Sequence, residues 1–238
     1  MKKNNHPKVC IVIPAYNEGS VLGDVLQNLK KKLKNTAYDT TIVVINDGST
    51  DNTSVVAKAN GVVVIDHILN SGAGDATATG IEFARRGDFD ITATMDADGQ
   101  HAPNDVLKGI EIIKQSHDIG MLIGSRLIDT TGMSKRKILG NKGLSKITHM
   151  LFGINVTDSQ SGLRIFSRDA LEKIYWKSRG YEFCSEMLWR AKQNNIIVDE
   201  YPITAIYTDY SRSKGQNNWN AINIIKSLLR SRFVEIFE

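Results

Sequence analysis

The sequence has only two cysteines, and they lie far apart, at Cys10 and Cys184, without a Cys-x-x-Cys pair. Cys10 falls inside an apolar run, so we expect a buried, reduced thiol there rather than half of a disulfide. The sequence also lacks an uninterrupted apolar run long enough to cross a bilayer, and no signal peptide precedes the first apolar run. These absences predict a cytoplasmic protein.

Net charge is also small, at +4 over 238 residues, which is too little to indicate nucleic acid as a partner. The positive charge is uneven, however, because six basic side chains opposed only by Asp129 gather in one segment. They are Arg126, Lys135, Arg136, Lys137, Lys142 and Lys146. Such an excess is typical of a surface that meets phosphates or an anionic surface, and equally of a solvated loop. Both interpretations stay open.

Apolar runs and helical patterns alternate from residue 8 to about 123. The runs at 9–13, 41–45, 61–65, 91–95 and 120–123 predict strands, and the segments between them carry apolar residues at helical spacing. This alternation predicts a mainly parallel, right-handed wound α/β sheet. Further helices are expected at 135–152 and 183–194, with a strand near 196–198. No repeat or linker interrupts the chain, so we expect a single domain over residues 1–238.

Two aspartates, Asp96 and Asp98, follow the apolar run at 91–95. Alternate residues of a strand share a face, so both carboxylates can point the same way, and Gly99 lets the backbone turn sharply behind them. Two close carboxylates repel each other unless a cation lies between them. Oxygen ligands without Cys or paired His are typical of Mg²⁺ or Mn²⁺, which leave positions open for phosphates. The alternative is an ordinary Asp-rich turn.

Polar side chains follow several of the predicted strands. They are Asn17 and Glu18, Asp47, Asn70, and the Asp96–Asp98 pair. Ligands of wound α/β sheets bind beyond the carboxyl ends of the strands, so these residues are expected to gather at one edge of the sheet.

In the residues and the order of six motifs, the chain resembles the family 2 glycosyltransferases, and within them the dolichol- and polyprenyl-phosphate sugar (mannose or glucose) synthases. The motifs are residues 11–18 (IVIPAYNE), 44–51 (VINDGSTD), 70–76 (NSGAGDA), 96–101 (DADGQH), 124–126 (GSR) and 158–164 (DSQSGLR). The resemblance implies a GT-A fold with a mainly parallel, Rossmann-like sheet flanked by helices. It also implies a nucleotide-sugar donor, Mg²⁺ or Mn²⁺ as cofactor, and a lipid-phosphate acceptor.

The implied reaction is an inverting, metal-dependent transfer of a hexose to undecaprenyl or dolichyl phosphate at the cytoplasmic face of the membrane. The alternative is transfer to a hydroxyl of a glycan or cell-wall polymer. A catalytically silent nucleotide-sugar-binding protein would be expected to lose the metal ligands, whereas Asp96, Asp98 and Gln100 are all present.

The resemblance also implies roles for individual residues. The donor would contact Pro14, Ala15, Glu18, Asp47, Asp96, Ala97 and Lys214, with Asp47 at the base. The metal would be held by Asp96, Asp98 and Gln100, and the acceptor by Gln160, Ser161 and Arg164. Asp98, Arg126 and Arg164 are the predicted catalytic residues, because the cation that Asp98 would hold and the planar fork of arginine both stabilise phosphate charge. His101 is either a supporting group beside the metal ligands or a loop histidine without a role.

Two further patterns invite other interpretations. Gly72-x-Gly74 suggests a dinucleotide fold, but Thr77 stands where a third glycine is needed and the pattern follows the third strand. Glu182 and Glu186 lie one helical turn apart, so one of them can be a catalytic base. A phosphate acceptor needs no base, since it is largely ionised at neutral pH. We therefore expect these two residues to be structural or to belong to an acceptor loop.

Residues 216–238 form the last predicted element, an amphipathic helix that carries Lys226, Arg230 and Arg232. Such a helix can lie on an anionic bilayer, pack against the core or a second subunit, or bind a small membrane-protein partner. A peripheral contact with the inner face of the cell membrane is the expectation that follows, and a homo-oligomer is a further one.

Overall fold

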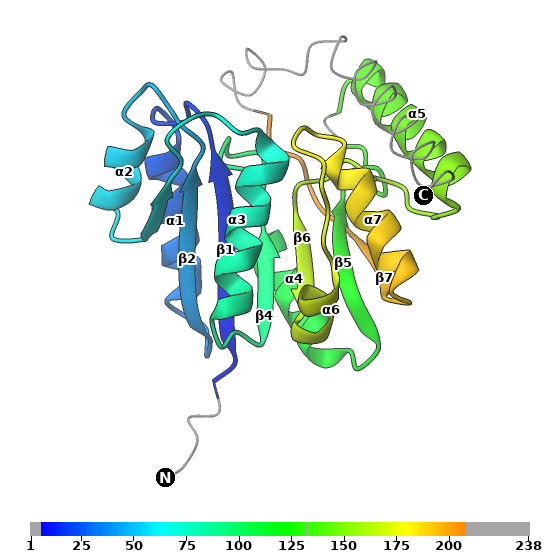
Figure 1. Cartoon of the computed structure of the whole chain (residues 1–238), viewed down its shortest axis with the longest axis horizontal. Coiled ribbons are helices and arrows are strands. Elements are labelled where there is room, and N and C mark those ends of the chain that lie inside the picture. Colours follow the sequence, from blue (N-terminus) through cyan, green and yellow to red (C-terminus); the bar gives the residue numbers. More distant parts are fainter. Residues whose placement is uncertain (1–5, 132, 208–238) are drawn as a thin grey trace.

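The computed structural model describes residues 6–131 and 133–207, which form one α/β domain (Figure 1). Its elements are β1 (Lys8–Ala15), α1 (Leu22–Leu33), β2 (Asp39–Asn46), α2 (Thr53–Ala59), β3 (Val63–Asp66), α3 (Ala73–Arg86), β4 (Ile91–Thr94), α4 (Pro103–Gln115), β5 (Ile119–Ser125), α5 (Lys135–Phe152), β6 (Arg164–Ser167), α6 (Arg168–Lys173), α7 (Phe183–Gln193) and β7 (Ile197–Pro202). Lys214 and the helix predicted for 216–238 lie outside the described residues.

The seven strands form one sheet in the order β3-β2-β1-β4-β6-β5-β7. All of its pairs are parallel except the two that β6 makes with β4 and β5. The predicted mainly parallel sheet is therefore confirmed. The sequence did not predict β6, whose first residue is Arg164.

Both faces of the sheet are covered by helices, and β1 shows how its sequence achieves this. Five consecutive residues, Val9 to Ile13, are fully buried. Cys10 and Val12 belong to the core cluster that includes α3 and α7 residues, whereas Val9, Ile11 and Ile13 belong to the cluster that includes α1 and α4 residues. Successive side chains of a strand point to opposite faces, so a continuous apolar run is what a doubly covered strand requires.

The carboxyl ends of β1, β2, β4 and β5 lie at one edge of the sheet, uppermost in Figure 1. The loops that carry the predicted site start from this edge, and α5 begins beyond it. Among the described helices, none is long and apolar enough to cross a membrane.

Candidate active site

The Asp-x-Asp motif lies directly beyond the carboxyl end of β4, where its two carboxylates are half-buried. Gly99 turns the chain with a φ of +78°, which only glycine adopts easily. Asp96 Oδ2 lies 3.0 Å from Nε2 of His101, whose side chain is 1% exposed. His101 is thus a buried group that orients Asp96, which favours the supporting role over that of a loop histidine without contacts.

Gly162 allows the loop before β6 to approach this carboxylate. A Cβ at Gly162 would lie 2.3 Å from Asp96 Oδ1 and 2.5 Å from Oδ2, closer than atoms can approach. The hydroxyl of Thr94, at the end of β4, donates to the Gly162 carbonyl at 2.9 Å. Asp96, Gly162 and Arg164 line one small pocket together with Pro14 and Thr94. The motif at 96–101 and the motif at 158–164 therefore form one site.

The two aspartates have opposite pKa shifts. Burial by itself would raise the pKa of Asp96. The hydrogen bond and attraction of His101, together with the charges of Arg126 and Arg164, instead hold this pKa below its ordinary value. Burial and the negative charge of Asp96 raise the pKa of Asp98. The protein therefore compensates the charge of Asp96 and leaves the charge of Asp98 poorly compensated, which is the electrostatic condition that a bound cation relieves.

The residues present fit Mg²⁺ or Mn²⁺ shared with a diphosphate. Gln100 donates its backbone amide to Asp98 Oδ1 at 3.0 Å and its side-chain amide to Asp98 Oδ2 at 2.5 Å. Within the described residues, no group of three or more His, Cys, Asp or Glu side chains surrounds a common point. The set offered here is two carboxylates and one amide, and hard oxygen ligands in small number suit a cation whose remaining ligands come from substrate phosphates.

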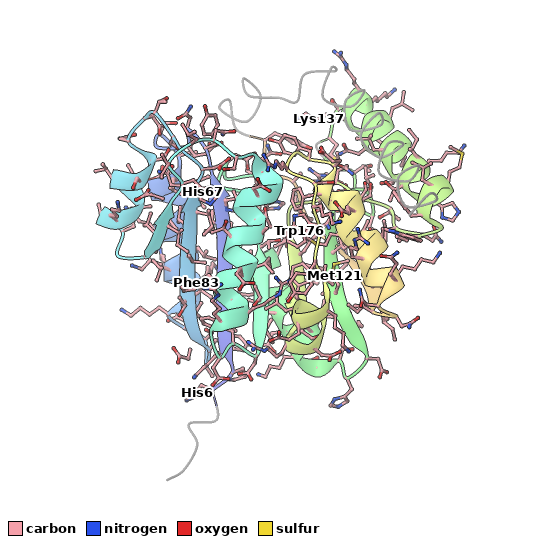
Figure 2. All side chains as sticks on the ribbon, in the orientation of Figure 1. His6, His67, Phe83, Met121, Lys137 and Trp176 are labelled. Carbon is pink, nitrogen blue, oxygen red and sulfur yellow. The ribbon has the colours of Figure 1, made fainter. Side chains whose placement is uncertain are left out.

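Asp47 follows β2 and is buried, with an exposed fraction of 3%. Its carboxylate accepts the backbone amides of Ser71 and Gly72, each at 2.9 Å, and its Oδ1 lies 2.8 Å from Nδ1 of His67. His67, labelled in Figure 2, also lies 3.0 Å through its Nε2 from Oγ1 of Thr79 on α3. Asp47 therefore braces the loop that opens α3. Its contact with a nucleobase stays a prediction.

The glycines of that loop serve close packing of the backbone. A Cβ at Gly74 would lie 2.2 Å from the carbonyl oxygen of Ser178, and the Gly74 amide donates to the carbonyl of Arg179 at 2.6 Å. Trp176, which lies between α3 and α7 in Figure 2, donates its indole N–H to the Gly74 carbonyl. The start of α3 is thus covered by the 176–179 segment, which agrees with rejecting the dinucleotide interpretation.

Three of the predicted donor residues, Pro14, Ala15 and Glu18, lie at the end of β1 or in the loop after it. Pro14 lines the pocket with Asp96, whereas the side chains of Ala15 and Ala97 are buried in the core. The backbone amide of Glu18 donates to Thr53 Oγ1 at 2.9 Å, so the loop is held against the start of α2. Because the side chains of Ala15 and Ala97 are buried, only the main chain of these two residues can face a donor.

Arg126, just after β5, forms a bidentate ion pair with Asp158. Its Nε and Nη2 lie 2.7 Å and 2.9 Å from the two carboxylate oxygens. Although burial opposes its charge, Asp158 raises the pKa of Arg126 further above its ordinary value, and Asp96 contributes in the same direction. Arg126 is therefore held in place near the Asp-x-Asp motif.

Arg164 is placed differently from the phosphate-facing arginine expected from the sequence. The residue is 1% exposed. Its guanidinium donates to the main-chain carbonyls of Ser159, Ser161 and Cys184 at 2.8–3.1 Å, and to the sulfur of Met187. These bonds join the 158–164 loop to α7. The placement favours a supporting role with a charge that reaches Asp96, and the acceptor contact stays a prediction.

The remaining acceptor candidates are also hydrogen-bonded within the protein. Ser161 is fully buried and donates its hydroxyl to the Gly124 carbonyl at 2.6 Å. Gln160 donates its side-chain amide to Ser185 Oγ at 3.0 Å. Glu186 is 7% exposed and accepts the backbone amides of Lys177 and Ser178. These contacts favour the structural role for Glu186, one of the two roles expected for it.

Glu200, on β7, was not singled out from the sequence. Its carboxylate accepts the backbone amides of Thr157 at 2.7 Å and Asp158 at 3.1 Å, and so fixes the start of the 158–164 loop. Neither Glu200 nor His67 lies in a recognisable local motif, because the partners of both are distant in sequence. His101 differs from them, because it lies only five residues after Asp96 and a contact between the two could be considered from the sequence.

Comparison with known proteins identifies the family of this chain. The family model described as glycosyl transferase family 2 matches residues 10–175. A UDP-N-acetylglucosamine–dolichyl-phosphate N-acetylglucosaminyltransferase of Methanococcus voltae is 39% identical over 97% of this chain and 98% of its own length. A polyprenol monophosphomannose synthase of Mycolicibacterium smegmatis is 27% identical over 94% of this chain and 85% of its own.

Among solved structures, the glucosyl-3-phosphoglycerate synthase of Mycobacterium tuberculosis covers 95% of this chain and 80% of its own, with a TM-score of 0.70 and 20% identity. That likeness shows the GT-A-like fold. The same synthase has been crystallised with Mn²⁺, UDP and glucosyl-3-phosphoglycerate. With the family model covering residues 10–175 of 238, this chain belongs to glycosyl transferase family 2 and is a glycosyltransferase.

Proposed function

We propose that this glycosyltransferase moves a hexose from a nucleotide sugar to the phosphate of a polyprenyl phosphate, with inversion, at the cytoplasmic face of the membrane. The observation that carries the proposal is the meeting of Asp96 and Asp98 with Arg126 and Arg164 at the carboxyl edge of the sheet. Asp96 and Arg164 line one pocket, and the charges of Asp98 and Arg126 lie close enough to interact with Asp96. Such a cluster of charges suits a reaction between two phosphate-bearing substrates. The two relatives named for dolichyl-phosphate and polyprenol substrates support the same acceptor class.

Asp96 and Asp98, with Gln100, would hold Mg²⁺ or Mn²⁺, and this cation would supply positive charge to the diphosphate of the donor as it leaves. His101 keeps Asp96 ionised and oriented through the 3.0 Å contact. Asp98 has a raised pKa in the absence of a counter-charge, so loading the site favours its ionised form. We infer that these two carboxylates set the position of the leaving group.

The reaction breaks the bond between the anomeric carbon and the diphosphate oxygen and forms a bond from that carbon to an oxygen of the acceptor phosphate. The acceptor is already an anion near neutral pH, so no side chain has to take a proton. This agrees with Glu186, whose carboxylate is committed to the amides of Lys177 and Ser178. Attack opposite the departing diphosphate inverts the anomeric configuration.

Binding the acceptor phosphate falls to the loop that contains Gln160 and Ser161, together with the charge of Arg126 and Arg164. Because their side chains are hydrogen-bonded within the protein, we infer that the loop presents a fixed, electropositive wall rather than a free arginine clamp. Positive charge that is already held in position stabilises developing negative charge without reorganising.

UDP-N-acetylglucosamine is the first donor to test, because the Methanococcus voltae relative is named for it and matches almost the whole chain. The full chain is incubated with radiolabelled donor, Mg²⁺ and three acceptors: a polyprenyl phosphate, the corresponding polyprenol, and an oligosaccharide. We expect label to enter the organic phase only with the polyprenyl phosphate. Transfer to the polyprenol or the oligosaccharide at a comparable rate would reject a phosphate acceptor.

A further inference from the structure

We propose that the exposed side of α5 docks the enzyme on an anionic bilayer. The surface consists of Lys135, Leu139, Lys142, Lys146 and Met150, and we call it the α5 basic face. These residues follow one another at intervals of three or four, so they lie along one side of the helix. The inference deepens the proposed function, because a polyprenyl phosphate is itself a membrane lipid.

Both large apolar side chains of this face are open to solvent. Leu139 and Met150 are each 75% exposed, and the three lysines beside them are exposed as well. Helix α5 contains no aspartate or glutamate over its 18 residues. Apolar side chains flanked by cations, with no opposing acid, are the combination by which an interfacial helix binds anionic lipid.

The opposite side of α5 fixes its orientation. Leu144 and Phe152 are buried, the ring of Phe152 packs on Trp189 with centroids 5.4 Å apart, and Thr148 Oγ1 lies 2.9 Å from Ser185 Oγ on α7. On the outer side, a Cβ added at Gly140 or Gly143 would meet nothing within 4 Å. The helix already has a packed face, so the α5 basic face is not needed for the core.

The position of α5 suits an acceptor that arrives from a membrane. The helix begins ten residues after β5 ends, beyond the same edge of the sheet that carries Asp96 and Asp98 (Figure 1). Figure 2 shows Lys137, in the first turn of α5, at this end of the molecule. Ile128, three residues after β5, adds a further apolar side chain that is 49% exposed. Docking through α5 would therefore bring the catalytic edge to the lipid surface.

Charge favours a bilayer over a second copy of this chain. A two-fold dimer through the α5 basic face would bring the same lysines from both copies together, and facing like charges are unfavourable. An anionic lipid surface supplies the opposite charge for all of them. Each basic side chain near such a surface strengthens binding, and salt weakens the attraction.

The test measures sedimentation of the full chain with vesicles of phosphatidylcholine alone or mixed with phosphatidylglycerol. Wild-type protein should bind the mixed vesicles and release with salt. Lys142→Gln/Lys146→Gln should weaken this binding about thirtyfold, and Leu139→Ser/Met150→Ser at least tenfold. The matched control is Lys31→Gln/Lys32→Gln, which removes the same charge from the last turn of α1 and should bind as wild type does.

The outcomes separate this inference from its rivals. Binding by both α5 variants as tightly as wild type, with unchanged circular dichroism, would overturn it, and so would an equal loss in the α1 control. A wild-type dimer that the Leu139→Ser/Met150→Ser variant dissociates, without vesicle binding, would assign the face to a second copy. Transfer to a short, water-soluble lipid phosphate should be unchanged in both variants. If the wild type fails to transfer sugar to that acceptor, the proposed function is rejected. The vesicle experiment still tests the α5 basic face independently.

Discussion

Arg126 and Asp158 form a buried ion pair that joins the loop after β5 to the loop before β6. Asp158 is fully buried and accepts from three nitrogens of Arg126, including its backbone amide. Glu200 accepts the backbone amides of Thr157 and Asp158 at the start of the same loop. The pair therefore does two things: it keeps a positive charge near Asp96, and it fixes the position of the 158–164 loop.

Asp158→Asn should lower the free energy of unfolding by roughly 3–5 kcal/mol, because it leaves the guanidinium of Arg126 buried without its counter-charge. Urea unfolding followed by circular dichroism measures the change. Asp118→Asn, at an exposed position, is the control and should lie within roughly 0.5 kcal/mol of wild type. A similarly small effect of Asp158→Asn would show that the pair does not support the loop.

Arg164→Lys should lower the free energy of unfolding by roughly 2 kcal/mol or more, because lysine cannot reach the three carbonyls that the guanidinium joins. The KM values for donor and acceptor should then rise together. Arg86→Lys, on the exposed side of α3, is the matched control with little expected effect. Unchanged stability with a rise in the acceptor KM alone would restore the acceptor contact predicted from the sequence.

Asp98→Asn should reduce transfer roughly a hundredfold or more, since it removes one of the two carboxylate charges that would hold the cation beside the departing diphosphate. The fold should be intact, because Asp98 is only half-buried at the edge of the sheet. We also expect UDP with Mn²⁺ to raise the melting temperature of wild type and not of the variant. Asp88→Asn, at the opposite edge, controls for loss of charge. Normal turnover of Asp98→Asn across a Mg²⁺ and Mn²⁺ titration would show that the metal assignment is wrong.

Both cysteines are buried, and burial raises the pKa of Cys10 to about 12 and of Cys184 to about 11, against an ordinary value of 9.0. Folding therefore keeps both thiols protonated, and their contribution to stability is present below pH 9 and lost as the pH rises through these values. We expect a thiol reagent to modify neither cysteine in the native protein at pH 8 and both in urea. Rapid modification before unfolding would contradict the burial of the strand and helix that carry them.

Local patterns predicted most of the fold, and the exceptions have one cause. The runs that became β1, β2 and β4, and the helical spacing of α1, α4 and α5, depend on residues close in sequence, so their periodicity was visible. Strand β6 has four residues and begins with a buried arginine. Its antiparallel pairing with β4 depends on residues about seventy positions away, such as Ala93 with Ile165, which no local pattern records.

The same distinction applies to the site. Asp96 and Asp98 were recognisable because two carboxylates and a glycine follow one apolar run. The amides that Asp47 accepts, at Ser71 and Gly72, and one of the carbonyls that Arg164 donates to, at Cys184, lie at least twenty residues away. A charged side chain in a motif suggests a ligand, and only the folded structure shows that main-chain groups already occupy it.

The product of the reaction tests the central claim most directly. Wild-type protein is incubated with UDP-N-acetylglucosamine, whose anomeric bond is α, a polyprenyl phosphate and Mg²⁺, and the lipid product is examined by mass spectrometry and by proton NMR of its anomeric centre. The account predicts one sugar joined through its anomeric carbon to the lipid phosphate, in the β configuration. An α-linked product, or a sugar joined to a hydroxyl instead of the phosphate, would contradict it.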